Sequence, residues 1–205
     1  MPNTSKIAKL KRYIKHHYTV FFQRYFNITI VRQRKNPKTI PIIINNFNQL
    51  FYLKQLIESL QKRGYTNIVI LDNNSSYKPL LDYYKSIEKA VKIHRLSSNY
   101  GHLSFWKQSE LVEKYTKGYY VVTDPDIVPL AECPDDFLKT MLKLIDKAYD
   151  RTKVGFSLKL DVIPDCNPQK KTIQDWESQF WTSKIHPLAY KAEIDTTFAL
   201  YRPGY

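Results

Sequence analysis

Two carboxylates separated by a proline, Asp124-Pro125-Asp126, are the residues of this sequence best suited to hold a divalent cation. They follow four apolar residues and Thr123, a run that is typical of a buried strand and places the triplet at its end. Mg²⁺ and Mn²⁺ take oxygen ligands, commonly one or two carboxylates together with the phosphates of a substrate. A cation held here would neutralise a diphosphate group and stabilise its developing charge. A turn or helix-cap role for the two aspartates is the alternative.

Further polar side chains follow other predicted strands. Asp72 ends the second strand, where an acid can bind the base or ribose of a nucleotide. Asn73 belongs to the same cluster, and both residues could instead form a turn through bonds to the backbone. Asn45 and Asn46 end the first strand, where they could read the edge of a base or cap the helix that follows. We therefore expect a nucleotide site built from these residues together with Asp124.

A third cluster, Asn99 to His102, interrupts the chain before a predicted helix. Gly101 permits a positive φ or a close approach of the backbone to a phosphate, so we assign Asn99 and Gly101 to the nucleotide site. His102 could contact a diphosphate or have a structural role. The sequence contains neither a GxGxxG fingerprint nor a Walker motif, which excludes a Rossmann dinucleotide site and a P-loop.

Acids close to two tryptophans could serve as a general base. Glu177 lies between Trp176 and Trp181, whose rings could stack on the apolar face of a sugar. A carboxylate placed there could deprotonate an acceptor hydroxyl. Asp175 and Asp195 compete with Glu177 for this role. The alternative is that both indoles pack beneath a loop.

The elements that must position these residues alternate along the chain. We expect strands at 39–44, 67–71, 91–96, 119–123, 153–160 and 192–201, and helices at 51–63, 79–90, 104–115 and 137–149. This alternation predicts an α/β fold with a mostly parallel central sheet flanked by helices. Ligands of such sheets bind outside the carboxyl ends of the strands, where all the polar clusters fall. The sequence therefore predicts one pocket.

Charge divides the chain into two parts. The net charge is +13, and ten Lys or Arg residues lie between Lys6 and Lys38, which leaves about +3 for the rest. We treat residues 1–38 as a basic amphipathic segment, which suits peripheral contact with an anionic membrane or a helix packed on the domain with a solvated face. No nucleic-acid-binding motif accompanies the charge, so we expect no nucleic-acid partner. Cys133 and Cys166 form no disulfide framework, which favours the cytoplasm.

Three segments resemble the GT-A fold glycosyltransferases, especially family-2-like bacterial enzymes: Ile42–Phe47 (IIINNF), Ile70–Ser75 (ILDNNS) and Val121–Asp126 (VVTDPD). The resemblance implies a Rossmann-like GT-A catalytic domain over residues 39–205 and a UDP- or GDP-linked sugar donor. It implies a metal on Asp126, with Asp124 towards the ribose or the metal and Asp72 near the base or ribose. Inverting members of the family use a later acid as base, and Glu177 or Asp175 would take that role here.

The resemblance predicts transfer of a sugar to a glycan or lipid-linked acceptor in surface polysaccharide synthesis, assisted by Mn²⁺ or Mg²⁺, on the cytoplasmic face of the membrane. The alternatives are a sugar-1-phosphate nucleotidyltransferase and a non-catalytic glycan- or membrane-binding module. GT-A enzymes often supply a late histidine to the metal. The sequence has no histidine between His186 and Tyr205, so we expect either a C-terminally truncated domain or an incomplete metal site.

Overall fold

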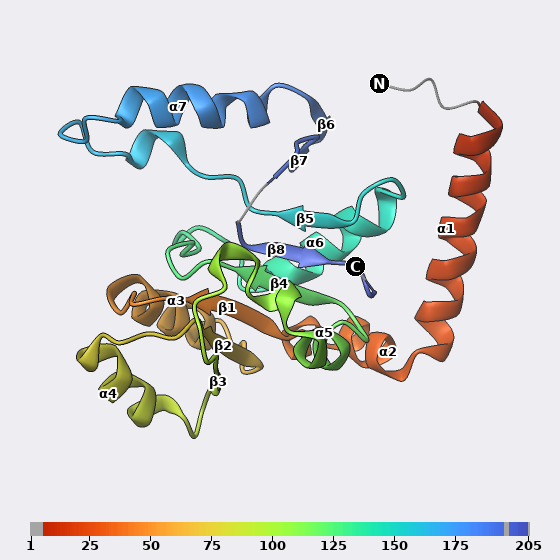
Figure 1. The fold of residues 1–205 in the computed structure, drawn as a ribbon. Helices are drawn as coiled ribbons and strands as arrows, with labels where there is room; N and C mark the ends of the chain where they lie inside the picture. Colours follow the sequence, from red (N-terminus) through yellow and green to blue (C-terminus); the bar gives the residue numbers. More distant parts are fainter. Residues whose placement is uncertain (1–5, 195–196, 205) are drawn as a thin grey trace.

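The computed structural model describes residues 6–194 and 197–204, and over these residues the core is a six-stranded sheet in the order β3-β2-β1-β4-β8-β5 (Figure 1). The first four strands in this order run parallel, and β8 runs antiparallel to both β4 and β5. The predicted mostly parallel sheet is therefore confirmed. Its strands are β1 (Ile42–Asn46), β2 (Ile68–Asp72), β3 (Lys92–Arg95), β4 (Tyr120–Thr123), β5 (Lys153–Gly155) and β8 (Ala199–Tyr201).

Helices cover both faces of the sheet, as the sequence predicts. The helices are α1 (Lys6–Phe26), α2 (Ile28–Lys35), α3 (Phe51–Lys62), α4 (Lys78–Ile87), α5 (Ser109–Tyr115), α6 (Phe137–Lys147) and α7 (Lys170–Ser178). One face packs against α2, α3, α4 and α6 and the other against α5 and Phe105. The side chains of β1 alternate between these layers, because Ile42 and Ile44 join the first and Ile43 the second. A strand buried on both faces reads as a continuous apolar run, which explains its clear sequence signal.

Three predicted elements differ from the observed ones. The helix expected at 104–115 is two pieces, the 3₁₀ turn Phe105–Lys107 and α5, because Gln108 between them has a non-helical backbone with φ −106° and ψ 88°. The strand expected at 153–160 ends at Gly155, and the last strand begins only at Ala199. β5 is the far edge strand of the sheet and β8 is its neighbour, and the two are paired over only three residues.

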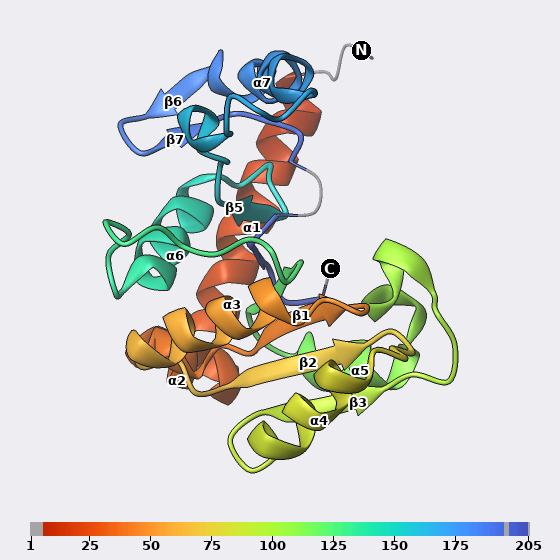
Figure 2. The same ribbon diagram turned by 90° about the vertical axis from the view of Figure 1, so that its left-hand side faces the viewer.

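The segment between β5 and β8 forms a layer beyond the edge of the sheet. It contains the 3₁₀ turns Leu160–Val162 and Gln179–Trp181, helix α7, and the hairpin of β6 (Lys184–His186) with β7 (Ala189–Tyr190). Figures 1 and 2 place this layer at the opposite end of the molecule from β3 and α4.

The basic N-terminal segment forms two helices joined at Asn27. The Asn27 side chain caps α2 by accepting hydrogen bonds from the N–H groups of Thr29 and Ile30. Helix α2 and the 3₁₀ turn Pro37–Thr39 lead into β1, and Ile30 is part of the core. Helix α1, in contrast, has no buried residue. Among the described residues, no helix combines the length and apolar character needed to cross a bilayer.

Candidate functional site

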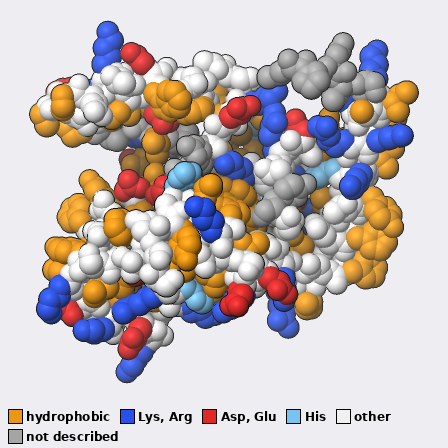
Figure 3. All heavy atoms as spheres, in the orientation of Figure 1, with side chains coloured by type: hydrophobic (Ala, Val, Ile, Leu, Met, Phe, Trp, Pro, Cys, Tyr) orange, Lys and Arg blue, Asp and Glu red, His pale blue; other side chains and the backbone are white. Residues whose placement is uncertain are grey.

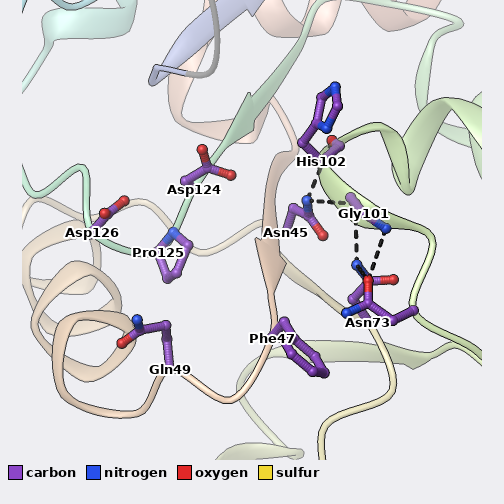
Figure 4. A pocket seen from close by; sticks show the side chains of 10 residues that line it. Asn45, Phe47, Gln49, Asn73, Gly101, His102, Asp124, Pro125 and Asp126 are labelled. Atoms are coloured by element: carbon purple, nitrogen blue, oxygen red, sulfur yellow. Dashed lines mark hydrogen bonds between the residues drawn. The ribbon is translucent and has the colours of Figure 1, made fainter.

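The polar clusters predicted from the sequence meet in one cavity of about 300 Å³ at the carboxyl ends of β1, β2 and β4 (Figure 4). Each of the four clusters that follow a predicted strand contributes at least one residue to this lining. Such a cavity is at the lower end of the range for small-molecule sites. The lining residues are Asn45, Phe47, Gln49, Asn73, Asn99, Gly101, His102, Asp124, Pro125 and Asp126.

The Asp124-Pro125-Asp126 triplet forms one wall of this cavity. Strand β4 ends at the buried Thr123, whose hydroxyl donates a hydrogen bond to the carbonyl of Asp124 at 3.0 Å. Pro125 is buried, Asp124 is partly buried and Asp126 is exposed. In the view of Figure 4 the two aspartates lie on the left of the opening, across from Asn45, Gly101 and His102. The triplet therefore presents carboxylate oxygens, the ligands that Mg²⁺ and Mn²⁺ prefer, at the mouth of the pocket.

The two carboxylates of the triplet are not part of a larger group of metal-ligating side chains among the described residues. Among residues 6–194 and 197–204, no three His, Cys, Asp or Glu side chains gather closely enough to hold a metal ion. Two carboxylates nonetheless fit a cation that takes its remaining ligands from water and phosphate oxygens. His186 lies on the distant hairpin, where its Nδ1 accepts a hydrogen bond from the N–H of Leu188 at 3.2 Å.

Asn73 and Asn99 hold the glycine loop in place. The Asn73 amide donates to Asn99 Oδ1 at 2.7 Å and to the carbonyl of Gly101 at 3.1 Å, and its oxygen accepts from the N–H of Tyr100 at 2.8 Å. Asn99 Oδ1 also accepts from the N–H of Gly101 at 2.8 Å. Gly101 has φ +73°, the left-handed region that favours glycine. The expected ligand contacts of these three residues stay predictions, and in the structure their polar atoms shape the loop.

Asn45 connects the same loop to the first strand. Its Oδ1 accepts a hydrogen bond of 2.6 Å from the Ser104 hydroxyl, and its amide nitrogen lies 3.5 Å and 3.4 Å from the carbonyls of Gly101 and His102. The two longer contacts are near the limit for hydrogen bonds, so the amide group is the part of Asn45 that a ligand could engage at little cost.

Asp72 and Asn46 lie beneath the pocket and are absent from its lining. Asp72 is 2% exposed and Asn46 is fully buried. The Tyr84 hydroxyl joins them, donating to Asp72 Oδ1 at 3.1 Å and accepting from Asn46 Nδ2 at 2.8 Å. Burial raises the pKa of Tyr84, and the nearby Asp72 carboxylate adds to the rise, so the phenol keeps the proton that it donates. The nucleotide contacts expected of Asp72 and Asn46 stay predictions.

Asn48 braces the two loops below the pocket mouth. Its backbone has φ +54°, which asparagine tolerates better than most residues. Its Oδ1 accepts from the N–H groups of Ser76 and Tyr77 at 2.9 Å each, and its own N–H donates to Ser75 Oγ at 2.9 Å. The loops after β1 and β2 are therefore held together as one rim.

The acids proposed as general base lie on α7, outside the pocket lining. Asp175 is exposed, and Glu177 is half-buried with its pKa raised by burial. Trp176 is 65% exposed, while the Trp181 ring packs against Tyr190 with 5.3 Å between centroids. Figure 3 shows a hollow between the α7 layer and the body that carries the pocket. Asp195, the third candidate, lies outside the described residues.

Sequence reasoning missed several members of the site. Phe47 and Gln49 line the pocket, and their position just after β1 is the signal that would have identified them. Tyr84 and Ser104 support the site through side-chain hydrogen bonds from a helix and a loop distant in sequence. No local pattern marks them.

No protein-family model matches the sequence, and no curated protein shows significant sequence similarity to it. Among solved structures, S. aureus TarS 1-349 has a TM-score of 0.51 and 19% identity, covering 80% of this chain and 47% of that one. A second S. aureus TarS structure has a TM-score of 0.43 and 20% identity, covering 58% and 21%. The mannosyltransferase PcManGT from Pyrobaculum calidifontis, in complex with GDP-Man and Mn²⁺, has a TM-score of 0.41 and 11% identity, covering 75% and 47%.

The chain thus spans about half, or less, of the length of these structures. The likeness to TarS 1-349, a glycosyltransferase, shows that this chain has the same GT-A-like fold. The predicted fold class, an α/β GT-A-like sheet flanked by helices, is confirmed.

Proposed function

We propose that the protein is a glycosyltransferase that moves a sugar from a UDP- or GDP-linked donor to a glycan or lipid-linked acceptor in surface polysaccharide synthesis. One observation carries the proposal. The carboxylates of Asp124 and Asp126 line the same cavity as Asn45 and Gly101, at the edge of a GT-A-like sheet where nucleotides bind. A nucleoside diphosphate needs both a cation and polar groups, and the side chains that line this cavity are of the kinds that bind each.

Asp126 is the proposed metal ligand, and Asp124 binds the same cation or the donor ribose. When bound, Mn²⁺ or Mg²⁺ neutralises the diphosphate leaving group. Asn45 presents its amide group to the donor, while Asn73 and Asn99 keep the Gly101 backbone in place. Asp72 and Asn46 contribute from below, where Tyr84 fixes both side chains.

Glu177 is the proposed general base, with Asp175 as its neighbour on α7. Burial raises the pKa of Glu177, which makes its carboxylate a better proton acceptor than an ordinary glutamate. The exposed Trp176 could stack on the acceptor sugar beside it. Because α7 lies outside the pocket lining, a bound acceptor would have to fill the hollow between the two.

A lipid-linked acceptor would place the enzyme at the inner face of a membrane as a peripheral protein. The rival proposal is a non-catalytic glycan- or membrane-binding module. The position of Asp175 and Glu177 outside the pocket lining favours it. Turnover of a nucleotide sugar distinguishes the two, because only the enzyme releases nucleoside diphosphate.

Calorimetry with UDP and GDP, with and without Mn²⁺, tests the donor site. We expect Mn²⁺ to strengthen binding and Asp126→Asn to remove that gain, a loss of about tenfold or more in affinity, because a neutral amide is a weaker ligand for a divalent cation than a carboxylate. Glu132→Gln removes an exposed carboxylate from the loop that follows and is the matched control. The proposal would be contradicted by a nucleotide affinity that is the same with and without Mn²⁺, or by one that Asp126→Asn leaves unchanged.

A further inference from the structure

Helix α1 carries a continuous stripe of exposed apolar side chains along one side. Its members are between 56% and 67% exposed, and the stripe is made of Ile7, Leu10, Ile14, Tyr18, Phe21 and Tyr25. Figure 1 places α1 along the outer edge of the molecule, and Figure 3 shows hydrophobic side chains gathered on that edge beside Lys and Arg side chains. Soluble surfaces rarely leave so many large apolar groups together without a partner.

A different side of α1 rests on the domain. Tyr13 and His16 pack against Tyr149, with ring centroids 5.3 Å and 6.2 Å apart, and Arg24 bonds Asp146 at 2.9 Å. At 100° per residue these positions lie on average about 120° around the helix from the centre of the stripe, with Arg24 nearest to it at about 80°. The stripe therefore faces away from the protein.

The spacing of the stripe follows the helical period. Its members follow one another at intervals of 3, 4, 4, 3 and 4 residues, a mean of 3.6. This equals the period of a straight helix, so the stripe runs parallel to the axis.

The positive charges around the stripe favour an anionic partner. Helix α1 contains no Asp or Glu, and the first acidic residue of the chain is Glu58. Lys11 and Lys15 flank one side of the stripe, and Lys6 lies beyond the other. A second copy packed on this face would bring cations against cations, whereas phosphate headgroups would complement them.

We propose that α1 lies flat on an anionic phospholipid surface, with the stripe at the boundary between headgroups and acyl chains and the lysines at the phosphates. This extends the lipid-linked acceptor of the proposed function to the membrane that holds it. Vesicle binding requires no nucleotide, so this proposal and the donor-site proposal can each fail alone.

Co-sedimentation of the full chain with vesicles tests the surface. The vesicles are either phosphatidylcholine alone or an equimolar mixture with phosphatidylglycerol. We expect binding to the mixture that weakens as salt is raised. Tyr18→Ala with Phe21→Ala should lower the partition coefficient by about tenfold or more, because it removes two large apolar groups. Lys11→Gln with Lys15→Gln should lower it by about thirtyfold.

Matched variants separate this face from general hydrophobicity and charge. Ile185→Ala with Leu188→Ala removes two apolar side chains that are 60% and 69% exposed on the hairpin, and Lys62→Gln with Lys89→Gln removes the same charge elsewhere. Both should bind as the unchanged protein does. Equal loss in stripe and control variants would overturn the proposal. So would a stripe-dependent dimer in light scattering that leaves vesicles unbound, since it would assign the face to a second copy.

Discussion

At the scale of single residues, the site contains two kinds of side chain. Some line the pocket and could contact a ligand, and others are hydrogen-bonded within the protein and hold the loops in place. The Asn73 amide makes three hydrogen bonds to the 99–101 loop, and Asn45 keeps one strong bond to Ser104. Asp124 and Asp126 stand at the pocket mouth, while Asp72 is buried beneath it. In the proposed function, affinity for a donor would therefore depend partly on buried groups that the ligand does not reach directly.

Tyr84→Phe tests the buried support at this scale. The change removes the hydroxyl that joins Asp72 to Asn46, leaving a carboxylate oxygen and an amide nitrogen without a partner inside the protein. We expect the free energy of unfolding to fall by about 1–3 kcal/mol, measured by urea denaturation. Tyr83→Phe, on the partly buried neighbouring position of α4, should change it by less than about 0.5 kcal/mol. Equal effects from both variants would show that the network adds no stability.

At the scale of elements, the register of β4 fixes where the triplet lies. The Gln33 side chain of α2 makes two hydrogen bonds of 2.8 Å to the residue that precedes this strand. It donates one to the carbonyl of Tyr119 and accepts the other from the Tyr119 N–H. Gly118 makes room for this contact, because a Cβ there would lie 2.7 Å from Thr29 Cγ2 and close to the Gln33 amide. Helix α2 thus holds the strand that carries the proposed metal ligands.

Gly118→Ala should force α2 and β4 apart. Overpacking at a buried contact costs about 1–3 kcal/mol, and the two bonds from Gln33 to Tyr119 would weaken at the same time. Urea denaturation measures the loss, with the exposed Lys117→Ala as the neighbouring control. An unchanged midpoint for Gly118→Ala would mean that the interface relaxes freely.

The same elements show what the sequence can predict. Strands β1, β2 and β4 are buried on both faces, so their continuous apolar runs and the polar residues after them were predicted together with the pocket. The pairing of β8 with β4 and β5 depends on long-range contacts. Strand β8 has only three residues, which is too short to show a hydrophobic periodicity in the sequence. Asparagines at strand ends look alike in sequence whether they bind a ligand or a loop. The bracing by Asn73 was therefore not predictable.

At the scale of the whole molecule, the protein consists of a folded α/β body and a charged helix attached to its surface. Asp146 is the main anchor between them, bonded by Arg24 at 2.9 Å and by Arg34 at 2.6 Å and 3.1 Å. Arg34 belongs to α2, so this carboxylate stays paired in the absence of α1. The core, the pocket and the Arg34–Asp146 ion pair therefore all belong to the body and do not require α1.

Removal of residues 1–26 should separate the two parts. Helix α1 contributes no buried residue, and its Arg24 pair is partly exposed, so the free energy of unfolding should fall by less than about 2 kcal/mol. The deletion removes six Lys or Arg residues, which lowers the net charge from +13 to +7. Circular dichroism and urea denaturation would show the intact fold, and calorimetry the unchanged Mn²⁺-dependent nucleotide binding, while vesicle binding is lost. A truncated chain that unfolds, or that loses nucleotide binding, would instead make α1 part of the catalytic body.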